Sequence, residues 1–193
     1  MTEQQDLFSR NLAASTVAGD MLDLATRSLD ESESLDDARA RFRGFLHENK
    51  GKRGMPCPCC ERHAQIYRNK INANRARGLF WLIRSSLDGG VARLWVDVAE
   101  TAPRWLVRSN QLSFLRHWRL VERRGNNDDS TRKHTGIWRP TELGIRYAQG
   151  EERVPLHVFT LFDRVVKFSD EVADVRAAAG VDFDYGAMMR GEW

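Results

Sequence analysis

Apolar residues recur at three- and four-residue steps in the first part of the chain, which is the spacing of one face of an α-helix. We predict a first helix over about 15–28 and a second that begins at Ser34, whose hydroxyl can cap it while Asp37 reaches back. A longer pattern predicts a helix over about 65–87, which the turn at 88–90, Asp-Gly-Gly, ends. This part of the chain is therefore expected to be mainly helical.

Shorter elements follow. The predicted elements are a strand at 94–96, helices at about 98–105 and 109–118, strands at 120–124 and 136–139, and a helix that Thr141 caps. The last two strands are expected to form a hairpin with a long, polar tip.

The C-terminal part is rich in Val and Phe over 154–168, where Pro155 interrupts the run, and this predicts one or two strands. Large apolar groups within 183–189 predict a short helix that docks on the domain. Five tryptophans are expected in or just under the core: Trp81, Trp95, Trp105, Trp118 and Trp138.

The order of helix, short strand, helix, helix, two-stranded wing and helix resembles that of a winged-helix domain, a relative of the helix-turn-helix motif. Two phrases carry the resemblance, Leu112-x-x-Leu115-x-x-Trp118-Arg-Leu120 and Ile137-Trp-Arg-Pro-Thr141-Glu-Leu-Gly144. The link between the second and third helices departs from the family because it contains Pro103 and Trp105 where a tight turn is usual, and the wing tip is long.

Residues 55–193 also resemble a group of uncharacterised bacteriophage and prophage proteins. The shared phrases are Cys57-Pro-Cys-Cys60 leading into Ile66-Tyr-Arg-Asn-Lys70, Trp138-Arg-Pro-Thr-Glu-Leu-Gly144, and Phe183-Asp-Tyr185 with Met188-Met189. The resemblance implies a phage origin and carries no activity.

The expected fold class is α+β, with a winged-helix core, an N-terminal helical arm and a C-terminal strand and helix extension. The predicted organisation is an acidic helical arm at 1–49, a basic linker and cysteine turn at 50–64, a winged-helix domain at 65–150 and the extension at 151–193.

Length and composition agree with one moderate domain and its appendages, at 193 residues and 22.2 kDa. The longest purely apolar run is 79–83, so neither an ordinary signal peptide nor a membrane span is expected. The three cysteines lie within 57–60 and close no long loop, which excludes a secreted disulfide framework. We therefore expect a cytoplasmic protein, in the bacterial host cell if the phage resemblance holds.

Charge is strongly segregated along the chain. Residues 1–49 carry five Arg and ten acidic residues, residues 50–154 carry 21 Lys+Arg and ten, and residues 155–193 carry four and seven. A basic block of this size suits an anionic partner, nucleic acid first, although a solvated surface has the same composition. The acidic arm can pack on its own domain or on a second copy, which would make a homodimer.

If the chain is a winged helix that binds double-stranded DNA, the helix at 109–118 would lie in the major groove and the wing would contact the backbone or a minor groove. The candidate DNA-binding residues are Arg108, Ser109, Asn110, Gln111, Ser113, Arg116, Arg123, Arg124, Arg132 and Lys133. Such a DNA-binding protein would act in regulation or in phage DNA metabolism. The alternative is an interaction module that binds and modulates a host or defence protein without enzymatic activity.

The cysteine turn has a spacing that suits a structural Zn²⁺ ion. Cys57 and Cys60 are separated by two residues, and His63 follows three residues later. A closed zinc site needs a fourth ligand, for which Cys59, His134 and His117 are candidates. A reduced turn without metal and a redox dithiol remain as alternatives.

No enzyme class is expected. The sequence contains no GxxxxGK[ST], GxGxxG or GxSxG motif, and the acidic pairs at 128–129 and 151–152 lie in predicted loops.

Overall fold

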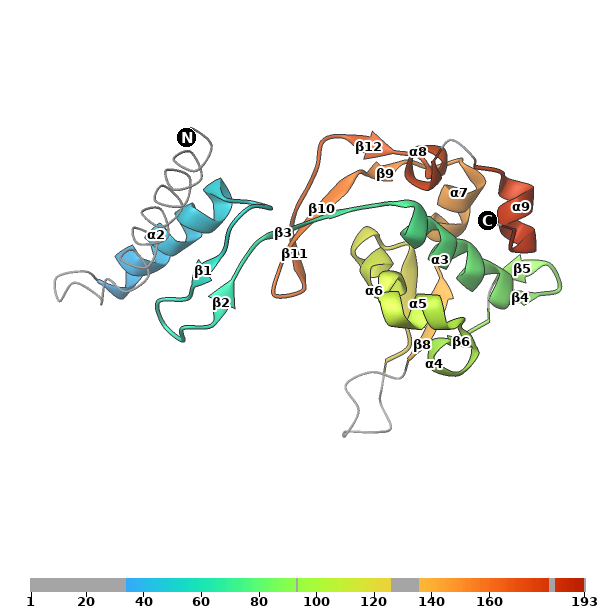
Figure 1. The fold of residues 1–193 in the computed structure, drawn as a ribbon, viewed down its shortest axis with the longest axis horizontal. Helices are drawn as coiled ribbons and strands as arrows, with labels where there is room; N and C mark the ends of the chain where they lie inside the picture. The colour runs from blue at the N-terminus through green and yellow to red at the C-terminus, as the bar shows by residue number, and fades with distance from the viewer. Residues whose placement is uncertain (1–33, 93, 126–135, 181–182, 193) are drawn as a thin grey trace, which may run out of the picture. The chain divides into compact units, whose positions relative to one another are not determined.

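The computed structural model describes residues 34–92, 94–125, 136–180 and 183–192, and its helices and strands are labelled in Figure 1. The fold is mixed α+β, as predicted. The chain divides into unit 1, Met1–Tyr67, and unit 2, Arg68–Trp193. Each unit is described by itself below.

Unit 1 contains helix α2 (Leu35–Glu48) and an antiparallel hairpin of β1 (Met55–Pro56) and β2 (His63–Ala64). The predicted cap of α2 is confirmed, because the Ser34 hydroxyl accepts a hydrogen bond from the Asp37 amide. Both the helix and the hairpin region contribute fully buried apolar side chains: Ala38, Leu46, Ala64 and Ile66. The first helix predicted for the arm, at 15–28, lies outside the described residues.

The single helix predicted over 65–87 is wrong at its start, and it ends two residues earlier than predicted. Residues Tyr67–Lys70 form strand β3, and helix α3 covers Ala73–Ser85. The Asn72 side chain caps α3 by accepting a hydrogen bond from the Arg75 amide.

Strand β3 forms because a distant part of the chain pairs with it. It lies beside β10 (His157–Leu161) in a sheet of order β11-β10-β3, and Asn69 donates a side-chain hydrogen bond of 3.0 Å to Thr160. Thr160 lies 91 residues from Asn69 along the chain, so the local periodicity does not predict this pairing.

The C-terminal end of α3 runs into a tight hairpin. Strands β4 (Leu87–Asp88) and β5 (Val91–Ala92) pair around Gly89 and Gly90, whose φ angles of 56° and 85° suit a two-residue turn. The predicted stop at 88–90 is therefore correct, and the Gly-Gly pair also marks a hairpin that was not predicted.

The predicted series of short elements follows, except that two short helices replace the one predicted over 98–105, and a short helix with a 3₁₀ turn replaces the one predicted over 109–118. The series comprises β6 (Val96–Asp97), α4 (Val98–Thr101), α5 (Arg104–Ser109), α6 (Gln111–Leu115), the 3₁₀ turn η1 (Arg116–Trp118), β7 (Val121–Arg123) and β8 (Ile137–Pro140). The three strands form an antiparallel sheet of order β6-β8-β7, with Val96 opposite Trp138 and Val121 opposite Pro140. The predicted hairpin is confirmed, and its tip, 126–135, lies outside the described residues.

Helix α7 (Glu142–Gln149) begins at the predicted cap, where the Thr141 hydroxyl accepts a hydrogen bond of 3.0 Å from the Gly144 amide. The remaining elements are β9 (Val154–Pro155), β11 (Arg164–Phe168), β12 (Val172–Ala173), α8 (Val175–Ala179) and α9 (Tyr185–Arg190). Strand β12 pairs with β9, and β10 pairs with β11, so the predicted strands at 154–168 and the terminal helix are confirmed.

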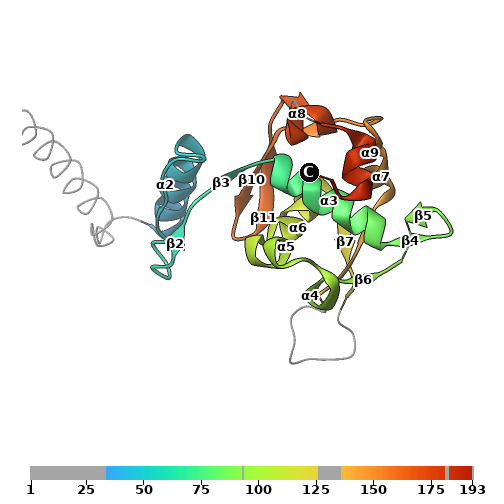
Figure 2. The same ribbon diagram turned by 45° about the vertical axis from the view of Figure 1, so that its right-hand side comes forward.

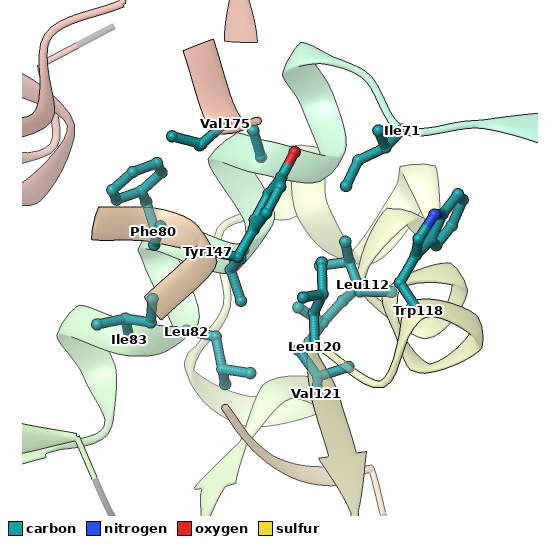
Figure 3. Close-up of a cluster of buried hydrophobic side chains, with 14 of the residues drawn as sticks. Ile71, Phe80, Leu82, Ile83, Leu112, Trp118, Leu120, Val121, Tyr147 and Val175 are labelled. Carbon is teal, nitrogen blue, oxygen red and sulfur yellow. The ribbon is translucent and has the colours of Figure 1, made fainter. Parts of the chain in front are cut away.

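Helix α3 runs through the middle of unit 2, with α5 and α6 on one side and α7, α8 and α9 on the other (Figures 1 and 2). Figure 3 shows Tyr147 between Phe80 on one side and Leu120 on the other. The Tyr147 hydroxyl donates a hydrogen bond of 3.2 Å to the Asp174 carbonyl, and burial raises the pKa of this side chain above its usual value. Of the predicted core tryptophans, Trp81, Trp118 and Trp138 are buried, and Trp95 and Trp105 are half-buried.

None of the helices in the described part of the chain has the length and apolar character that crossing a membrane requires.

Candidate nucleic-acid interface

The two short helices α5 and α6 meet at Asn110, which adopts a left-handed conformation with φ of 50°. Leu112, Leu115 and Trp118 form the buried face of α6 and η1. The Trp118 indole N–H donates a hydrogen bond of 2.6 Å to the Pro155 carbonyl, which fixes the end of η1 against the C-terminal extension. The opposite face of α6 lies beside the β7–β8 hairpin.

A buried arginine of α3 supports α6 from below. Arg75 is 6% exposed, and its Nε donates a hydrogen bond of 3.1 Å to Gln111 Oε1. Its guanidinium also lies 4.5 Å from the Phe114 ring centroid and 5.5 Å from that of Trp118. Burial lowers the pKa of Arg75 to about 10, so the group stays charged at neutral pH. Arg75 therefore fixes α6 on α3.

Turn η1 contacts the tip of the β10–β11 hairpin. The two-residue tip, Phe162 and Asp163, has positive φ angles of 47° and 64°. Asp163 forms an ion pair with Arg116, and its Oδ1 lies 3.3 Å from Nε2 of His117. The Asp163 carboxylate is thus paired with Arg116, one of the arginines predicted to contact DNA.

These charges shift one another's pKa values. Burial, and then the neighbouring Arg116, lower the pKa of His117 below its usual value, while Asp163 opposes this shift. The hydrogen bond from Arg116 lowers the pKa of Asp163. The carboxylate therefore stays ionised, and His117 tends to remain neutral near neutral pH.

The wing strands also carry arginines that lie over aromatic rings. The Arg123 guanidinium lies 5.6 Å from the Trp138 ring centroid, and that of Arg139 lies 4.4 Å from the Trp95 centroid. Arg139 also forms an ion pair with Glu122. This pairing neutralises a wing carboxylate that would otherwise repel an anionic ligand.

A cleft of about 420 Å³ lies between α6, η1, the β7–β8 hairpin and the tip of the β10–β11 hairpin. Its lining includes Asn110, Ser113, Arg116, Arg123, Trp138 and Asp163. Side chains of α6, η1, the wing and the hairpin tip therefore meet around one concave surface that carries two arginines and one carboxylate.

The predicted DNA-binding residues fall into three groups. Arg108, Asn110 and Arg124 are exposed. Five are half-buried, and several of these have contacts within the chain: Ser109, Gln111, Ser113, Arg116 and Arg123. Gln111 accepts from Arg75 and donates to the Ser109 carbonyl, so both ends of its amide are already engaged. Arg132 and Lys133 lie outside the described residues.

Sequence reasoning missed Arg75 and Asp163. The sequence does not indicate the contact of Arg75 with Gln111, because the two residues are 36 positions apart. The break between two apolar runs at Phe162 and Asp163 signals a hairpin turn, but nothing local indicates contact with Arg116, which lies 47 residues away.

The cysteine turn lies between β1 and β2. The Cys57 amide donates to the Arg62 carbonyl at 2.9 Å, and the Glu61 amide donates to the Cys57 carbonyl at 2.8 Å. Hydrogen bonds from the backbone amides of Cys59 and Cys60 lower the pKa of the Cys57 thiol. The turn therefore favours a thiolate at Cys57.

The predicted third zinc ligand is oriented toward the start of the hairpin. Nε2 of His63 lies 2.5 Å from the position that a Gly54 Cβ would take. Among the described residues, no group of three or more His, Cys, Asp or Glu side chains is arranged to hold a metal ion. His134 lies outside this part of the chain, and His117 lies beside Asp163 in unit 2.

Comparison of the chain with protein-family models, with curated proteins and with solved structures gave no match.

Proposed function

We propose that unit 2 is a winged-helix domain that binds double-stranded DNA, with α6 as the helix that enters the major groove and the β7–β8 hairpin as the wing. The element order and the sheet order β6-β8-β7 support this proposal, because a winged helix places its recognition helix beside such a three-stranded sheet. The fold alone does not imply DNA binding.

The observation that carries the function is the charge of this one surface. Residues 102–125 contain six arginines, and Glu122 is the single acidic residue among them. Because Glu122 is paired with Arg139, the described strands of the wing present little negative charge to a phosphate backbone. The arginines lie in α5 and η1, which flank α6, and on or beside the first wing strand, and arginines in these places suit phosphate contacts.

The side-chain contacts divide the proposed work among the residues. Exposed Arg108 and Arg124 contact phosphates at the two ends of the surface. Asn110 and Ser113 line the cleft and are the groups for contacts with base edges. Gln111 instead holds the helix in place through Arg75.

Binding of the full chain to a mixed-sequence duplex, measured by fluorescence anisotropy at several salt concentrations, tests the proposal. We expect the double variant Arg108→Gln/Arg124→Gln to bind about tenfold more weakly, and the slope of log K against log salt to fall by about 2. Each phosphate contact that forms releases counterions from the DNA. A variant with fewer contacts therefore releases fewer of them, and the slope becomes smaller.

The matched control is Arg153→Gln/Arg176→Gln, which removes two exposed arginines of unit 2 that lie outside the helix and wing. It has the same change in net charge and is expected to bind within about twofold of the unaltered chain. The same affinity loss in both double variants, or no binding by the unaltered chain at low salt, would contradict the proposal.

Asp163 is expected to weaken DNA binding, because it competes with phosphate for Arg116. Replacement by Asn keeps the left-handed turn conformation and removes the charge. We expect Asp163→Asn to bind duplex about two- to fivefold more tightly in the same assay, since an exposed ion pair is worth up to about 1 kcal/mol. Asp170→Asn removes an exposed carboxylate elsewhere and is the control. Equal gains in both variants would show a general charge effect only.

A second candidate function, protein binding, is favoured by strand β11. All five of its residues are exposed, and Val166 and Phe168 are each 41% exposed at the edge of the β11-β10-β3 sheet. An apolar edge strand is a common site for pairing with another chain. A chain that fails to bind duplex in the assay above would leave this function as the better one.

A further inference from the structure

We propose that the turn between β1 and β2 binds one Zn²⁺ ion that two copies of the chain share, with Cys57 and Cys60 of each copy as its four ligands. The proposal concerns unit 1 and does not rest on DNA binding by unit 2. It differs from the zinc site expected from the sequence, because His63 is not a ligand and the missing ligands come from a second copy.

The turn between β1 and β2 contains Cys57 and Cys60 with two residues between them, which is the spacing of two ligands to one metal ion. Two backbone hydrogen bonds close the turn, from the Cys57 amide to Arg62 and from the Glu61 amide to Cys57. Glu61 adopts φ of 58°, which lets the chain reverse immediately after Cys60.

Among the described residues, no third Cys, His, Asp or Glu side chain is arranged with Cys57 and Cys60 to hold a metal ion. The three cysteines of the protein all lie in the turn, and residues 1–46 contain no histidine. The ring of His63 lies against Gly54, at the far end of the hairpin from Cys60. Structural zinc sites are almost always four-coordinate, so two cysteines make half of such a site.

A second copy can supply the other half. Cys60 is exposed and Cys57 is half-buried, so the two thiols are accessible to an identical turn related by a twofold axis. Zn²⁺ displaces one proton from each of the four thiols, and the four protons pass to solvent. The resulting site carries two net negative charges, and nearby Lys52, Arg53 and Arg62 offset them.

Zinc stoichiometry of the full chain tests the proposal. The protein is purified under reducing conditions, titrated with Zn²⁺ and measured by native mass spectrometry together with elemental analysis. We expect one zinc per two chains, bound within a dimer, and the spectrum of a four-sulfur site when Co²⁺ replaces Zn²⁺.

Variants separate this site from the alternatives. Cys57→Ser and Cys60→Ser should each lose the zinc, while Cys59→Ser and His63→Ala should keep one zinc per two chains. Fluorescence of the tryptophans, all of which lie at or after residue 81, confirms that unit 2 stays folded in each variant. One zinc per chain, zinc loss in His63→Ala, or no zinc binding would overturn the proposal.

Discussion

Replacing Gly144 by Ala is expected to destabilise unit 2 by about 2–3 kcal/mol or more. A Cβ at this position would lie 2.0 Å from the Leu120 carbonyl oxygen, which is backbone and cannot move aside as a side-chain tip can. The same carbonyl accepts a hydrogen bond of 3.1 Å from the Thr141 amide, so a shift there also disturbs the start of α7. Urea unfolding followed by tryptophan fluorescence measures the change, since every tryptophan belongs to unit 2.

The same chemical change at Gly44 is the control. Gly44 lies inside α2, and a Cβ there meets no atom of the described residues within 4 Å. Gly44→Ala should leave the tryptophan transition unchanged and stabilise α2 by about 0.5–1 kcal/mol, because alanine loses less backbone entropy in a helix. A Gly144→Ala protein within about 0.5 kcal/mol of the unaltered chain would show that α7 does not pack closely on Leu120.

The tight packing at Gly144 lies in the part of the fold that the sequence predicts well. The caps at Ser34 and Thr141 were predicted because a cap is a contact between residues three apart. The hairpin of β7 and β8 was predicted because alternation within each strand is also local. Local chemistry therefore accounts for the starts of α2 and α7 and for the β7–β8 hairpin.

The errors come from contacts between distant residues. Tyr67–Lys70 belongs to a helical pattern in the sequence, and it forms a strand because β10 supplies its hydrogen bonds. Ile71, the next residue, is fully buried in the structure, so its apolar character fits both a helix and a strand followed by a buried residue. Tertiary pairing overrides periodicity in such a segment.

The candidate site shows the same division. Residue type and spacing identified α6 and the wing as the basic surface, and the exposed Arg108 and Asn110 agree with that prediction. The sequence does not reveal that Gln111 is held by Arg75 or that Arg116 is paired with Asp163. These pairs decide which side chains a ligand can reach, and they depend on the folding of the C-terminal extension.

Replacing Phe80 by Ala is expected to destabilise unit 2 by about 3–5 kcal/mol. Phe80 is fully buried on α3, and its ring centroid lies 5.9 Å from that of Phe183 and 5.8 Å from that of Tyr185. The ring therefore joins the central helix to the C-terminal segment that contains α9. Its loss leaves a cavity and removes two aromatic contacts, so hydrogen exchange of the amides at 183–192 should rise along with the fall in unfolding free energy.

Phe162→Ala removes the same ring at the tip of the β10–β11 hairpin, where the side chain is 60% exposed. It is expected to change the unfolding free energy by about 0.5 kcal/mol or less, because little apolar surface is buried there. If both variants lost the same stability, the size of the residue rather than its burial would control the effect. If Phe80→Ala lost stability while exchange at 183–192 stayed unchanged, the C-terminal helix would be held by contacts other than those with Phe80, such as the buried Met188.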